Sequence, residues 1–151
     1  MIMGDMIAQT IQLALAPVFV LVAIGNILNG LSSRLGRVVD RSRELQRRHA
    51  ATAGAEHDAV VREIRLTDRR IGLIGQAILL LVLSGLSIGL VCVVLFVQEL
   101  LVMDLQRFAA GAFLLAILLL MWALLLFMRE TQHAAAALRI PKNYLELERK
   151  L

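Results

Sequence analysis

The chain has little of what soluble proteins use for cross-linking and catalysis. Its 151 residues include one cysteine, two prolines and three histidines. Cys92 has no second cysteine to pair with, so an internal disulfide is excluded. The spacing of His49, His57 and His133 fits no zinc motif, and neither a nucleophile elbow nor a phosphate-binding loop occurs. We therefore expect no enzyme, no cofactor and no metal site.

Charged residues are also few, at 19%, and aromatic residues make up 5%. No Lys- or Arg-rich stretch has the interleaved aromatic residues that grip a nucleic acid strand, so we expect no nucleic acid partner despite a net charge of +4. What the chain has in excess is apolar side chains, which make up 59% of it. A soluble domain is nearer half apolar, so this composition indicates a membrane protein.

The apolar residues are concentrated in three runs, about 6–28, 72–97 and 108–128, each long enough to cross a bilayer as a helix. Between the first two runs, apolar residues recur at helical spacing on both sides of the turn-like stretch 51–58. The sequence predicts an all-α, single membrane domain over residues 1–151. Its three transmembrane helices are accompanied by an antiparallel helical hairpin at 31–71, which prolongs the first two, and by a tail at 129–151.

The basic residues are distributed unevenly around these runs. The segment 34–70 holds ten arginines, the loop 98–107 holds only Arg107, and the tail 129–151 holds five basic residues. Short loops rich in Lys and Arg stay in the cytoplasm. We therefore expect a multi-pass protein of the cell (inner) membrane, with the hairpin and the C-terminus in the cytoplasm and the N-terminus outside.

One face of the first helix carries an unusual stripe, which we call the amide stripe. At ~100° per residue, one acidic residue, three amides and several small or aromatic residues fall on one side of it. The members are Asp5, Gln9, Gln12, Ala16, Phe19, Ala23, Asn26 and Gly30, followed by Arg34, Arg37, Arg41 and Arg48. Polar groups in hydrocarbon need partners or water. A homo-oligomer with this face turned inward would provide them.

The amide stripe has two interpretations that the residues leave open. In the first, it lines an ion-conducting pore, in which acidic rings concentrate cations, an apolar section gates the pore and the four arginines form basic rings at the cytoplasmic end. In the second, it is a helix–helix interface in which the amides hold copies together without a pore. The arginines have further interpretations, as topology signals and as ligands of anionic lipid headgroups.

The segments QLALAPVFVLVAIGNILNGLSSRLGRVVDRSREL and EIRLTDRRIGLIGQAILLLVLSGL resemble the bacterial "domain of unknown function 2721" family. The resemblance runs from Gln12 to the end of the third apolar run, and its signature is the first run continuing into Arg34, Arg37, Asp40 and Arg41. It implies a small three-span inner-membrane protein of bacterial type, and it implies no activity.

The function predicted from these patterns is a small homo-oligomeric ion channel, with cations as the expected permeant ions and the lipid bilayer as its surroundings. The alternative is a non-conducting scaffold whose hairpin docks a partner protein. In the second run, Gly85 and Gly89 form a small-xxx-small pair, which predicts close helix packing there.

Overall fold

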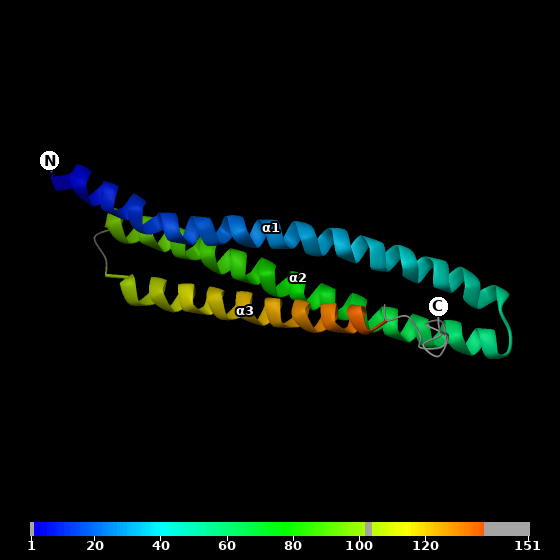
Figure 1. Ribbon diagram of the computed structural model, residues 1–151. Coiled ribbons are helices and arrows are strands. Elements are labelled where there is room, and N and C mark those ends of the chain that lie inside the picture. Colours follow the sequence, from blue (N-terminus) through cyan, green and yellow to red (C-terminus); the bar gives the residue numbers. More distant parts are fainter. Residues whose placement is uncertain (1, 102–103, 138–151) are drawn as a thin grey trace, which may run out of the picture.

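The structure is a computed structural model that describes the backbone of residues 2–101 and 104–137 and the side chains of residues 11–101 and 104–134. It consists of three long helices, α1 (Ile2–Ala51), α2 (Ala55–Leu101) and α3 (Gln106–Ala137). Figure 1 shows α2 lying between α1 and α3, with the α1–α2 hairpin continuing past the end of α3. No strand occurs in the described residues. The predicted all-α fold is therefore confirmed.

All three helices are long and apolar enough to cross a membrane. Side chains such as Leu86, Leu118 and Trp122 are well exposed along them, as expected for surfaces that face lipid rather than water. The chain is a multi-pass membrane protein. The predicted continuity of the first two spans into a hairpin is also confirmed, because neither α1 nor α2 is interrupted between its apolar part and the turn.

The turn between α1 and α2 is shorter than the predicted stretch 51–58, because α2 already begins at Ala55. The Thr52 hydroxyl donates to the carbonyl oxygen of Arg48 at 2.9 Å and so satisfies one of the last carbonyls of α1. Gly54 then adopts a φ of +67°, the left-handed conformation that commonly ends a helix and that suits glycine best. Glu56 and Asp58 lie in the first turn of α2, where negative charge complements the helix dipole.

The helices pack through residues spaced seven apart. Such a repeat keeps one seam of each helix facing its neighbour and indicates left-handed supercoiling. The buried seam of α1 is Pro17, Ile24, Leu31, Val38 and Leu45. Helix α2 has two seams, the first formed by Val60, Thr67, Ile74, Leu81 and Ile88 and the second by Ala77, Ser84 and Val91. The buried seam of α3 is Ala109, Ala116, Ala123 and Glu130.

Small residues let α2 and α3 approach each other closely. Ala77 and Ser84 on α2 and Ala116 on α3 are fully buried. The Ser84 hydroxyl donates to the carbonyl oxygen of Ala116 at 2.7 Å, which joins the two helices. In hydrocarbon this contact gives the hydroxyl a partner that the bilayer cannot supply. The small side chains of the alanine seam of α3 thus allow α2 to pack closely against α3.

Candidate functional site

The most distinctive polar feature of the described residues is an ionic cluster that joins the three helices. Glu130 of α3 is completely buried, with 0% of its side chain exposed. Arg34 of α1 places its Nε 2.9 Å from the Glu130 Oε2. Arg70 of α2 places its Nε 3.1 Å and its Nη2 3.0 Å from Oε1. We call Arg34, Arg70 and Glu130 the ionic cluster.

The heptad pattern explains why Glu130 is buried. It continues the alanine seam of α3, seven residues after Ala123, and therefore points into the bundle rather than away from it. A carboxylate in such a place is very costly unless it is paired. Both arginines supply positive charge, and Arg70 donates a hydrogen bond to Oε1. Oε2 is ion-paired with Arg34 but accepts no hydrogen bond among the described residues. The cluster lies where the apolar runs end. Glu130 lies just past the third apolar run, and Arg70 lies just before the second.

Arg34 is held by a second contact. Its guanidinium carbon lies 5.4 Å from the centre of the Phe127 ring of α3, within the range of a cation–π interaction. Phe127 and Glu130 are three residues apart, so they lie on one face of α3. The side chain of Arg34 is thereby fixed between a ring and a carboxylate, and its 25% exposed fraction shows that it is only partly open to the surroundings.

The amide stripe lies on a face of α1 that is about 100° or more around the helix from its buried seam, because Ala16, Ala23 and Gly30 each directly precede a seam residue. Every member whose side chain is described up to Gly30 is exposed, namely Gln12, Ala16, Phe19, Ala23, Asn26 and Gly30. The exposed fraction of Phe19 reaches 70%. The predicted pore residues Asp5 and Gln9 lie outside the part whose side chains are described. The stripe therefore does not pack against α2 or α3 within the chain.

The four arginines predicted to continue the stripe have different environments. Arg34 turns toward α3 and joins the ionic cluster. Arg41 donates from Nε at 2.9 Å and from Nη2 at 2.6 Å to Glu63 of α2, on the exposed side of the hairpin. Arg48 pairs with Glu44 one turn earlier at 3.3 Å. Arg37 is exposed. The described part of the hairpin thus neutralises several of its arginines internally.

The predicted glycine pair is not equally close to a neighbouring helix. A methyl group built on Gly85 would lie 3.6 Å from Leu21 and 3.8 Å from Ile24 of α1, which is ordinary van der Waals contact. A methyl group on Gly89 would meet nothing within 4 Å. Gly85 faces α1, whereas the tightest packing in this region comes from Ser84 and the alanines of α3.

The histidines do not form a metal centre in the described residues, where no group of three or more potential ligands gathers. His49 and His57 lie on either side of the hairpin turn, with ring centroids 4.4 Å apart and an interplanar angle of 52°. His133 is exposed on α3. The two hairpin rings pack against each other and help to close the end of the hairpin.

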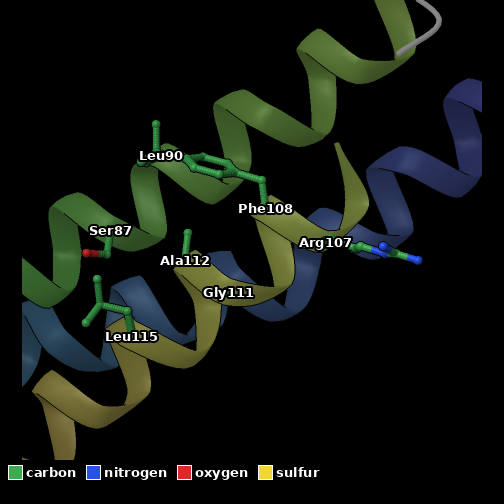
Figure 2. Close-up of a pocket in the computed structure, with 7 residues that line it drawn as sticks. All are labelled: Ser87, Leu90, Arg107, Phe108, Gly111, Ala112 and Leu115. Atoms are coloured by element: carbon green, nitrogen blue, oxygen red, sulfur yellow. The ribbon is translucent and has the colours of Figure 1, made fainter. Parts of the chain in front are cut away.

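A shallow groove of about 370 Å³ lies between α2 and α3 toward the end away from the hairpin. It is lined by Ser87, Leu90, Arg107, Phe108, Gly111, Ala112 and Leu115, and Figure 2 shows Arg107 pointing away from the other side chains. The Ser87 hydroxyl donates to the carbonyl oxygen of Leu83 at 3.0 Å. The groove therefore lacks the converging polar groups of a small-molecule site.

The sequence predicts that the stripe residues share one face of α1, but it did not lead us to the ionic cluster. Glu130 follows Arg129 directly after an apolar run, which resembles an ordinary charged flank of a membrane span. The signal that identifies it is the seven-residue spacing from Ala109 through Ala116 and Ala123, which marks the buried seam before Glu130 is reached.

Comparison with known proteins gives one family. A family model described as "Protein of unknown function (DUF2721)" matches residues 14–140. No curated protein matches the chain significantly. No solved structure matches it significantly either.

Proposed function

This chain belongs to the family described as "Protein of unknown function (DUF2721)", and from that premise we propose that it is a self-associating membrane protein whose copies meet along the amide stripe and form a small ion channel. The observation that carries the proposal is the outward position of the stripe. Gln12 and Asn26 are exposed and have no hydrogen-bond partner among the described residues, although both lie in an apolar run.

An amide without a partner in hydrocarbon costs several kcal/mol. The described residues of the chain offer no partner for the stripe, because α2 packs against a different face of α1, the one that carries the buried seam. Copies arranged around an axis would satisfy the amides through each other or through water along that axis. An oligomer in which water along the axis solvates the amides would contain a conduction path. Asp5 would stand at its outer end, and an acidic ring there favours cations.

The size of the stripe side chains suits a narrow path. Ala16, Ala23 and Gly30 leave space close to the helix axis, whereas Phe19 projects from it with 70% of its side chain exposed. A ring of aromatic side chains between two amide rings is a hydrophobic constriction of the kind that gates by dewetting. We assign the gate of the proposed channel to Phe19.

Ion flux into liposomes containing the purified protein tests the proposal. Ala23→Trp places a large ring on the stripe, whereas Val22→Trp places it about 100° around the helix on another exposed position. We expect cation flux in the wild-type protein and in Val22→Trp. Ala23→Trp should lose most of that flux. Absence of wild-type flux for several ions and voltages, or equal flux in both variants, would contradict a path along the stripe.

The alternative is a membrane scaffold whose hairpin docks a partner protein. Leu66 lies in the hairpin, four residues before Arg70, and half of its side chain is exposed. A single exposed leucine is common on protein surfaces, so Leu66 serves here as the position that tests the alternative. A stoichiometric protein partner that Leu66→Glu releases, together with absence of flux, would favour this second function over the channel.

A further inference from the structure

We propose that Arg34 and Arg70 form a binding site for the phosphate group of an anionic phospholipid, with Glu130 as the buried group that positions them. The inference concerns the surface of a single chain and does not depend on the channel. Its starting point is the burial of the three members of the ionic cluster. Glu130 is 0% exposed, whereas the side chains of Arg34 and Arg70 are 25% and 30% exposed.

The cluster therefore hides its negative charge and presents its positive charge. Two guanidinium groups share one carboxylate, which leaves one net positive charge at the surface. Arg34 uses its Nε toward Glu130, and its two Nη groups have no acceptor among the described residues. An arginine whose Nη donors stay available is well suited to bind phosphate oxygens in a fork.

Both guanidinium groups are also held in place before any ligand arrives. Arg70 contacts Glu130 through two nitrogens, and Arg34 is fixed between Glu130 and the Phe127 ring. A free surface arginine loses side-chain entropy when it binds a ligand, and these two have already lost it on folding. Preorganisation distinguishes this site from the exposed Arg37, which contacts no acid in the described part of the chain.

The position of the cluster identifies a lipid as the source of the phosphate. Glu130 lies two residues beyond the apolar run 108–128, and Arg70 lies two residues before the run 72–97. At about 1.5 Å per residue, the guanidinium groups stand within a few ångströms of the end of the hydrocarbon layer. Lipid phosphates lie at this level, and basic side chains there attract anionic lipids. The exposed Arg69 and Arg129 are sequence neighbours of Arg70 and Glu130 and add positive charge, which the exposed Asp68 partly offsets.

Arginine-to-lysine substitutions separate this site from diffuse attraction. Lysine keeps the charge but removes the planar fork. Full-length protein in nanodiscs of phosphatidylcholine with increasing phosphatidylglycerol is analysed for bound phosphatidylglycerol by native mass spectrometry. We expect selective retention of phosphatidylglycerol by the wild-type protein, and at least about threefold weaker retention by Arg34→Lys/Arg70→Lys, since lysine cannot make the bidentate contact that a guanidinium group makes to phosphate. The matched control Arg37→Lys should retain as much as the wild type.

Equal retention in all three proteins, or no preference for phosphatidylglycerol over phosphatidylcholine in the wild type, would overturn the proposal. So would displacement of the lipid by millimolar inorganic phosphate, which would make free phosphate the ligand. A second measurement does not depend on the folding of a variant. A photoreactive phosphatidylglycerol headgroup should cross-link wild-type protein within 31–37, 67–73 or 127–133, and adducts confined to the hairpin turn or to Arg107 would place the lipid elsewhere.

Discussion

Arg70 of α2 directs both its Nε and its Nη2 to the same oxygen of Glu130, Oε1, at 3.1 and 3.0 Å. The other carboxylate oxygen is left to Arg34 of α1. Each helix therefore contributes one member of the cluster, and a shift of one helix along another would leave a charge buried without its partner. Alanine and leucine seams repeat themselves every seven residues and specify register weakly. We infer that the cluster selects the register of the bundle.

Removal of the Glu130 carboxylate should destabilise the bundle strongly. In Glu130→Ala the partly exposed guanidinium groups of Arg34 and Arg70 lose their counter-charge. Breaking a buried pair costs about 3–5 kcal/mol, and the partial exposure of the two arginines puts the expected loss at the lower end of that range. Denaturant unfolding in detergent, followed by circular dichroism, measures the loss. The control is Glu63→Ala, which breaks an exposed pair with Arg41 and should cost below about 1 kcal/mol. Similar losses in the two variants would contradict the special role of Glu130.

Enlarging the alanine seam should separate α2 from α3. Ala116 is completely buried and accepts the Ser84 hydroxyl through its carbonyl oxygen, so Ala116→Leu must push the helices apart at a cost of about 1–3 kcal/mol. Ala110→Leu adds the same side chain at an exposed position of α3 and should be nearly neutral. The midpoint of thermal unfolding in detergent reports both. A neutral Ala116→Leu would mean that the seam is looser than its burial indicates.

Alanine at two glycines should change the stability in opposite directions. Gly54 has a φ of +67°, so Gly54→Ala strains the turn by about 1–2 kcal/mol although nothing lies within 4 Å of the added methyl. Gly36 lies inside α1 with equal space around it, and Gly36→Ala should stabilise the helix by roughly 0.5–1 kcal/mol. Unfolding curves recorded side by side in the same detergent reveal the two signs, and a shared sign would refute the conformational argument.

The predicted orientation is testable with single cysteines. In a Cys92→Ala background, Ala53→Cys lies in the hairpin turn and Gln106→Cys lies at the start of α3. With ten arginines between 34 and 70, we expect the turn to be cytoplasmic. A membrane-impermeant maleimide added to intact cells should label Gln106→Cys and leave Ala53→Cys unlabelled until the membrane is permeabilised. The reverse pattern would place the hairpin outside.

The hydrophobic runs and the periodicity of 34–78 were enough to predict three helices and the continuous hairpin, because both depend on local sequence. The helical wheel also grouped the amide stripe on one face of α1. What local sequence lacks is the identity of the facing helix. Arg34 lies between the amide stripe and the buried seam that contains Leu31, and its direction depends on Glu130, 96 residues later in the chain.

The exposed residues of the amide stripe also show that local sequence does not identify what covers a helix face. A wheel groups Gln12, Asn26 and Gly30 on one face, but it cannot tell whether α2, α3 or another molecule covers that face. The structure excludes the first two for the described residues, since the packed seam of α1 is formed by Ile24, Leu31 and their heptad neighbours. Whether copies cover the stripe stays a prediction, and cross-linking through Ala23→Cys in the Cys92→Ala background measures it.

The uninterrupted course of α2 has a mechanical consequence. The helix runs for 47 residues from the hairpin turn through its apolar part, a rod of about 70 Å. Its first residue lies 15 positions before Arg70, or about 22 Å beyond the ionic cluster. If the cluster acts as the fulcrum, tilting the rod by about 10° moves the turn sideways by about 4 Å. A sideways force on the turn would then act on the membrane-embedded part of α2 as a torque about the cluster.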